Sequence, residues 1–225
     1  MNKENILFGV IGLLAGLIIG FVITNNYNRN SLSAQTTPTS PNSQMAGQTQ
    51  NPTQQNINAA MPGVSEALEK ADKDPNDFDS QIKAGEMFGR IQNFDKAITY
   101  FERANKIKPD DYQTIVILGN LNFDANKLDK AAEWYEKALA MKKDDVSVRT
   151  DYGLTFFLRQ PKDIERAIKE YQTSLSVDPN HEMTLQNLAV AYSEKKDAEG
   201  VKTTLAKLEK VNPQNKVIQK LKSSN

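Results

Sequence analysis

The sequence repeats itself at a step of 34 residues, and this period limits what the chain can fold into. Small and aromatic residues recur at fixed offsets, as Gly85, Ala97, Phe101 and Ala104 do in the first copy. The pattern returns from residue 112, from 146 and, more loosely, from 182, with two extra residues around Pro161. A period of this length is typical of a solenoid built by stacking one supersecondary unit on the next. Solenoids bind other molecules and rarely catalyse, so the sequence predicts a class of function but no particular partner.

Each copy is predicted to form two helices joined by a turn. In the first copy, apolar and small residues recur at helical spacing on both sides of a break at residues 92–95. Gly85 and Ala97 are expected to let the two helices cross closely, with Phe88 and Phe101 filling the space beside the crossing. The proline that ends the copy cannot continue a helix and sets the turn into the next unit.

These residues at these spacings resemble the tetratricopeptide repeat family over about 138 residues. The resemblance implies an all-α fold, a right-handed α-solenoid of helix-turn-helix repeats. The sequence departs from the family pattern at several positions. Lys143 replaces the proline of the second copy, Asn122 stands where an aromatic residue is usual, and Val201 and Leu208 replace alanines in the fourth copy.

The repeats and the composition of the flanking segments divide the chain into zones. The boundaries we expect are an N-terminal cytoplasmic stub (1–5), a transmembrane anchor helix (6–23), a disordered polar linker (24–63), an N-terminal half-repeat helix (64–77), four repeats (78–111, 112–145, 146–181 and the degenerate 182–215) and a C-terminal capping helix (214–225).

The segment Ile6–Ile23 contains only apolar residues and glycine. As a helix it would be roughly 27 Å long, close to the hydrocarbon thickness of a bilayer. A cleaved signal peptide is the alternative, but its apolar region is usually shorter and is followed at once by small residues. We therefore expect an uncleaved single-pass anchor. Lys3 precedes this helix and only Arg29 follows it closely, which favours an extracytoplasmic repeat domain on the inner membrane.

Three glycines of the predicted anchor, Gly12, Gly16 and Gly20, fall on one helix face. Such a face lets two helices approach closely in lipid, so it predicts self-association of the transmembrane helix into a homodimer. The alternative is that glycine is simply common in membrane helices.

The stretch 30–65 has no charged residue and no aromatic residue. It cannot bury enough apolar surface to offset the entropy of folding, so it is expected to remain disordered. A flexible chain of this length has a reach on the order of 30–35 Å. We expect it to tether the repeats to the membrane.

Composition excludes several classes of function. The formal net charge is zero, which offers no case for nucleic-acid binding. The chain has no cysteine and a single histidine, His181, whereas a metal site normally needs several such ligands. No phosphate-binding loop and no catalytic pair is present in the sequence, so we expect neither an enzyme nor a cofactor.

The family resemblance implies a concave groove, lined by the first helix of each repeat, that holds peptides. The positions expected to face it are Ile82, Glu86, Val116, Ile117, Asn120, Phe123, Leu154, Phe157, Leu158, Met183, Gln186, Asn187 and Val190. Phe123, Leu154, Phe157 and Leu158 are expected to form an apolar binding patch. The alternative is that some of these side chains turn inward and pack between repeats.

One subfamily grips the C-terminal carboxylate of chaperones with cationic groove residues. The matching positions here hold only uncharged or acidic residues: Ile82, Glu86, Ile117, Ser147 and Asp151. A bound carboxylate would have no cationic partner, so the resemblance does not extend to chaperone-tail binding.

The function expected from these observations is a membrane-anchored interaction module, a scaffold or adaptor for a protein or peptide partner in a bacterial envelope. Two alternatives remain. One is a role like that of anchored repeat proteins that hold apoprotein peptides during cytochrome c maturation. The other is a soluble secreted binder, released if the N-terminal segment is cleaved.

Overall fold

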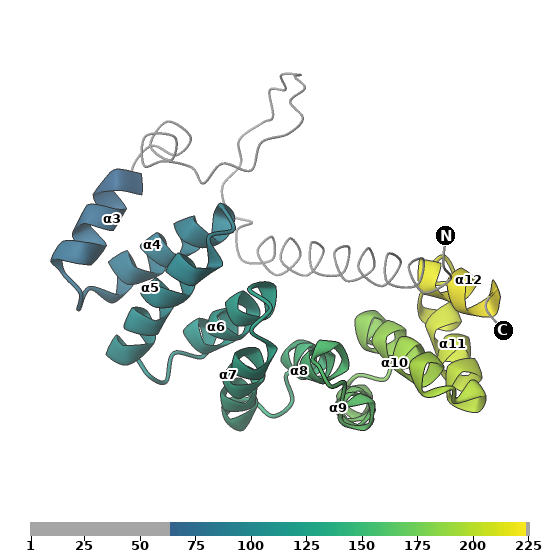
Figure 1. Cartoon of the computed structure of the whole chain (residues 1–225). Coiled ribbons are helices and arrows are strands. Elements are labelled where there is room, and N and C mark those ends of the chain that lie inside the picture. Colours follow the sequence, from purple (N-terminus) through teal and green to yellow (C-terminus); the bar gives the residue numbers. More distant parts are fainter. Residues whose placement is uncertain (1–63, 224–225) are drawn as a thin grey trace, which may run out of the picture. The chain divides into compact units, whose positions relative to one another are not determined.

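The described part of the chain is helical. The structure is a computed structural model that describes residues 64–223, and over this range it contains no strand. We call these residues the repeat domain. Its helices are α3 (Val64–Lys73), α4 (Phe78–Arg90), α5 (Phe94–Ile107), α6 (Tyr112–Asp124), α7 (Leu128–Met141), α8 (Val146–Leu158), α9 (Ile164–Val177), α10 (Glu182–Lys195), α11 (Ala198–Val211) and α12 (Lys216–Ser223) (Figure 1).

The predicted anchor at 6–23, its glycines Gly12, Gly16 and Gly20, and the predicted linker at 24–63 lie outside the described residues. Within residues 64–223, no helix combines the length and the apolar composition needed to cross a membrane.

Helices α4 to α11 form four consecutive pairs, as Figure 1 shows. The two helices of each pair pack against each other, and the second helix of a pair packs against the first helix of the next. The first helices α8 and α10 also contact each other directly. The predicted all-α solenoid of helix-turn-helix repeats is therefore confirmed for the described residues. We refer to α4, α6, α8 and α10 as first helices and to their partners as second helices.

An aspartate caps each of the first three pairs at its start. The carboxylates of Asp77, Asp111 and Asp145 accept hydrogen bonds from the backbone N–H three residues on, at 3.2, 2.8 and 2.9 Å. Such a cap satisfies a backbone donor that has no partner inside the helix, and typically contributes about 1 kcal/mol. His181 takes this place before α10 and forms no side-chain cap bond. The regular spacing of these caps explains why the first helices begin in register.

A glycine on the first helix lies under an aromatic ring of the second helix in three of the pairs. A β-carbon built on the glycine would lie 2.5–2.7 Å from ring carbons, for Gly85 under Phe101, Gly119 under Tyr135 and Gly153 under Tyr171. Contacts that short do not occur between real atoms, so only glycine fits there. The expected close crossing at Gly85 is present, but Phe101 covers the glycine directly and does not lie beside the crossing.

The fourth pair reverses this arrangement. Here the ring belongs to Tyr192 on the first helix, and the glycine is Gly200 on the second helix, 2.6 Å from the ring by the same measure. Val201 and Leu208, which replace the expected alanines, are both buried. The larger side chains of Val201 and Leu208 fit on the second helix because, in this pair, the aromatic ring lies on the first helix and the glycine on the second.

Helices at both ends cover the outer faces of the pairs. The side-chain amide of Gln81 on α4 is fully buried and donates to the Ala71 carbonyl of α3 at 2.6 Å, which fixes α3 against the first pair. At the other end, Val217, Ile218 and Leu221 of α12 are buried against α10 and α11.

Candidate binding surface

The thirteen positions predicted to face a groove all lie on the first helices α4, α6, α8 and α10. We call the surface formed by these positions the first-helix surface. Nine of them keep part of the side chain exposed: Ile82, Glu86, Ile117, Asn120, Phe123, Leu158, Met183, Gln186 and Val190. Four are buried, with exposed fractions of 5–9%: Val116, Leu154, Phe157 and Asn187.

The expected apolar patch is divided between the surface and the interior. Leu154 and Phe157 are buried within the repeat domain, as the alternative interpretation required, whereas Phe123 and Leu158 keep exposed area. The ammonium group of Lys162 lies 5.1 Å from the centre of the Phe157 ring. In the free domain, Phe123 and Leu158 therefore contribute to the apolar part of the first-helix surface, whereas Leu154 and Phe157 contribute little.

Two polar side chains of this surface already make contacts within the domain. Asn120 accepts a hydrogen bond from the hydroxyl of Tyr135 at 2.8 Å. Gln186 accepts one from the side-chain amide of Asn215 at 3.2 Å, which links α10 to the start of α12. These contacts hold the two amides in fixed positions, which favours selective hydrogen bonding to a partner.

Two further carboxylates belong to this surface, Asp124 at the end of α6 and Asp151 on α8; we call them the carboxylate pair. Burial raises the pKa of the Asp124 carboxyl from 3.8 to about 7. Burial, and then the negative charges of Asp145 and Asp124, raise the pKa of the Asp151 carboxyl to about 7 as well. The two groups are thus close enough for the charge of one to act on the other.

Neither member of the pair has a hydrogen-bond or ion-pair partner for its carboxylate among residues 64–223. Glu170 shows the contrast, because its carboxylate is more deeply buried than the half-buried Asp124 and Asp151 and pairs with Arg149 at 2.8 Å and with Arg166 at 2.9 Å. Glu86, the other acidic residue on the surface, has Arg90 and Lys83 near it, and their charges partly oppose the rise in its pKa that burial causes.

Two more polar groups close to this surface also have no partner in the described chain. The hydroxyl of Tyr171 is fully buried and unbonded, and the same holds for the side-chain nitrogen of Asn187. Burial raises the pKa of the Tyr171 hydroxyl well above 10, and the negative charge of Asp151 raises it further. The hydroxyl therefore lies near Asp151.

Sequence reasoning placed Asp151 at a groove position but missed Asp124 and Tyr171. A signal for Asp124 did exist. A carboxylate in the last turn of a helix lies at the negative end of the helix dipole, where cationic residues are favoured. Tyr171 carried no such signal, because its spacing is that of an ordinary core residue.

A separate open cleft, with a volume of about 510 Å³, lies between α9, α10 and α11. Its lining is mixed, with Leu175 and Leu188 beside Glu199 and Lys207, and the Gln172 side chain donates to the Tyr192 hydroxyl at 2.8 Å across it. None of the thirteen predicted positions lines this cleft.

The described residues offer no grouping of three side chains suited to hold a metal ion. His181, the single histidine of the sequence, contacts the Thr184 hydroxyl through Nδ1 at 2.6 Å. The groups that the first-helix surface offers to a partner are amides, carboxylates and apolar side chains.

Comparison with known proteins agrees with this architecture. The family model of the tetratricopeptide repeat matches residues 78–111 and 112–145. Among solved structures, YrrB, described as a TPR protein with an unusual peptide-binding site, is 16% identical with a TM-score of 0.65, and the match covers 75% of this chain and 86% of that one. MamA of Desulfovibrio magneticus RS-1, from residue 41 to its end, is 17% identical with a TM-score of 0.62, covering 72% and 88%.

No curated protein matches the sequence. At such low identity, the similarity to YrrB and MamA shows the fold alone. Repeats of this family are generally protein-interaction modules and not enzymes. Residues 78–145 are therefore tetratricopeptide repeats, and the solenoid formed by residues 64–223 is of the tetratricopeptide type.

Proposed function

We propose that the repeat domain is a protein-interaction module that binds a peptide or protein partner on the first-helix surface. The observation that carries this proposal is the set of polar groups left without partners there, which include the carboxylate pair and the Tyr171 hydroxyl. The Tyr171 hydroxyl is fully buried, and buried polar groups are normally hydrogen-bonded because an unpaired one costs about 1–3 kcal/mol, whereas the two carboxylates are half-buried and keep area that a partner can reach. A partner that bonds to them would recover part of that cost. The peptide-binding site described for YrrB, which has the same fold, supports the choice of a peptide as partner.

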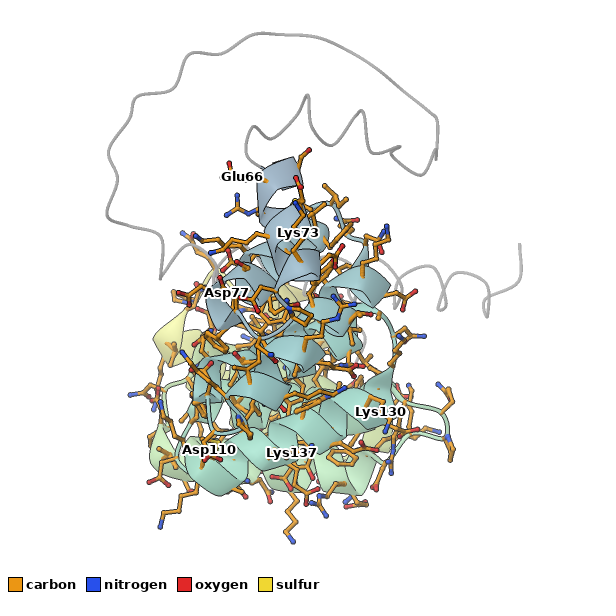
Figure 2. All side chains as sticks on the ribbon, turned by 90° about the vertical axis from the view of Figure 1, so that its left-hand side faces the viewer. Glu66, Lys73, Asp77, Asp110, Lys130 and Lys137 are labelled. Carbon is orange, nitrogen blue, oxygen red and sulfur yellow. The ribbon has the colours of Figure 1, made fainter. Side chains whose placement is uncertain are left out.

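Site-specific photo-cross-linking in cells tests this proposal. A photoreactive phenylalanine analogue replaces Phe123 or Leu158 of the first-helix surface, one position per variant, in the full-length chain. Control variants carry it at Lys130 and Lys137, which are exposed on the second helix α7 (Figure 2). We expect a discrete cross-linked product from the first two variants and none from the controls. Equal cross-linking from both sets, or from the α7 positions alone, would contradict the proposal.

We further propose that residues 6–23 anchor the chain in the inner membrane, with the repeat domain on the extracytoplasmic side and Gly12, Gly16 and Gly20 at a helix-association face. The support comes from the sequence, in which an uncharged apolar run of spanning length is preceded by Lys3. Anchoring would confine the interaction module to partners at the membrane surface, which suits a scaffold or adaptor.

Fractionation and a topology reporter test the anchor. The full-length chain should stay in the membrane pellet after a carbonate wash, and a reporter active only outside the cytoplasm should be active when fused after Asn225. Full-length protein in the soluble fraction would overturn the anchor. A mature N-terminus beyond residue 23, found by mass spectrometry, would instead identify the chain as a released soluble binder.

A further inference from the structure

The charges of the carboxylate pair are unfavourable in the free protein, because no cation of the described chain balances them as one would for a carboxylate with a structural role. Asp124 lies at the C-terminal end of α6, where the helix dipole disfavours a negative charge. Asp151 has the carboxylates of Asp124 and Asp145 near it, and like charges at short range repel each other. Elsewhere the chain gives a buried carboxylate two arginines, as at Glu170. The cation that would balance the carboxylate pair is missing from the described residues.

The Tyr171 hydroxyl gives an independent indication of a ligand at the same place. In the second repeat, the ring of Tyr135 passes over Gly119 and its hydroxyl bonds to the next residue of the first helix, Asn120. In the third repeat, Tyr171 passes over Gly153 in the same way. The next residue there is Leu154, which offers no acceptor, so the hydroxyl remains buried and unbonded.

The unpartnered groups match the donors of a basic side chain. An ammonium group has three N–H donors and a guanidinium has five, and neither can accept a hydrogen bond. Two carboxylates and a hydroxyl oxygen are all able to accept. A bound metal ion is disfavoured, because the described residues provide no group of three metal ligands. An anionic ligand is disfavoured by the two carboxylates themselves.

We propose that Asp124, Asp151 and the Tyr171 hydroxyl form a subsite for the side chain of a lysine or arginine in a bound peptide. This inference rests on the proposed peptide-binding function and specifies the class of partner: an extended or helical segment that carries a basic residue at one fixed position. The charge-assisted hydrogen bonds to that residue would set the register of the peptide on the first-helix surface.

Selection from a random twelve-residue peptide display library tests the subsite and does not require the natural partner to be identified. The bait is the full-length chain in mild detergent, as wild type and as the double variant Asp124→Asn/Asp151→Asn. The matched control is Asp110→Asn/Asp144→Asn, which removes the same charge from two exposed positions in turns (Figure 2 labels Asp110). We expect wild type and control to select peptides with a lysine or arginine at a fixed position, and the double variant to lose that preference.

Affinities of the selected peptides give the size of the effect. The double variant should bind them at least about tenfold more weakly than wild type, since one partner of a partly buried charge pair is lost, while the control should stay within about twofold. Norleucine in place of the basic residue of the peptide should weaken its binding to wild type similarly. This second measurement needs no protein variant, so it remains decisive even if the double variant fails to fold.

The outcomes separate the two proposals. Selected peptides with no basic preference, or affinities unaffected by norleucine, would overturn the subsite while leaving peptide binding intact. Equal losses in the double variant and in the control would show long-range attraction only, and would also overturn the subsite. If no peptide is selected, or if binding is insensitive to Phe123→Ala as well as to the carboxylate pair, the proposed function fails together with the subsite.

Discussion

At the scale of single residues, the carboxylate pair makes the stability of the domain depend on pH in an unusual direction. In the folded chain, both carboxyls have a pKa of about 7, well above the ordinary 3.8. The folded state therefore binds more protons than the unfolded state between these values, and the stability associated with these groups falls as the pH rises through that window. We expect Asp124→Asn and Asp151→Asn to be more stable than wild type at pH 8, and by a smaller margin at pH 5, which lies inside this window. Chemical denaturation of fragment 53–225, which contains the described helices, measures this.

The matched control is Asp144→Asn, because Asp144 is exposed in a turn. Its stability should follow wild type at both pH values. If either variant of the carboxylate pair were less stable than wild type at pH 8, that carboxylate would have a stabilising contact, and its assignment to a binding subsite would lose its basis.

Two glycines on α4 give a second prediction at this scale. A methyl group on Gly85 would lie 2.6 Å from the buried ring of Phe101, whereas one on Gly89 would lie 3.7 Å from its nearest neighbour, Leu121. Gly85→Ala should therefore destabilise the domain by about 1–3 kcal/mol through overpacking. Gly89→Ala should stabilise it by up to about 1 kcal/mol, because alanine favours the helix. Thermal unfolding of fragment 53–225 separates the two, and a loss of stability in both variants would point to a general intolerance of α4.

At the scale of elements, the turn between the helices of a pair contains a residue with positive φ in three of the four repeats. These residues are Gln92, Asn126 and Lys196, with φ between 57° and 62°. A residue other than glycine with such a positive φ costs roughly 1 kcal/mol, and among these residues asparagine tolerates the conformation best. We expect Gln92→Gly and Lys196→Gly each to stabilise the domain by about 0.5–1 kcal/mol, and Asn126→Gly to have a smaller effect. Denaturation midpoints give the ranking, and a larger gain at Asn126 would contradict the strain argument.

Elements were more predictable from the sequence than the exposure of individual side chains. The aspartate caps and the helical periodicity are local signals, so the starts of the first helices could be expected from the repeats. Exposure depends on neighbours. Phe123 and Phe157 occupy the same repeat position, yet only Phe157 is followed by a five-residue turn, 159–163, from which Lys162 lies over its ring. The burial of Phe157 and the reversed contact of Tyr192 with Gly200 both arise from such non-local packing.

At the scale of the whole repeat domain, stability should be distributed along the chain and not shared by all helices at once. Each helix pair packs mainly against its neighbours in sequence, so the loss of one interface should destabilise the adjacent pair first. The last interface is the one that α12 forms with α10 and α11. Ile218 and Leu221 provide apolar surface there and are buried, with exposed fractions of 3% and 8%.

Hydrogen exchange can test this behaviour with one variant and one control. Ile218→Ala with Leu221→Ala should destabilise the C-terminal end by about 2–5 kcal/mol, which is the usual range for truncating one buried aliphatic residue. We expect no larger loss from the two substitutions together, because α12 is short and can relax around them. Amide exchange should then speed up in α10 and α11 while α4 and α5 stay protected, since α4 and α5 pack mainly against each other and against α3 and α6. The control, Lys216→Ala with Gln219→Ala, changes two exposed residues of the same helix and should leave the exchange pattern unchanged. Uniform acceleration from α4 to α11 in the first variant would show instead that the domain unfolds as a single cooperative unit, so that binding at one repeat would be coupled energetically to every other.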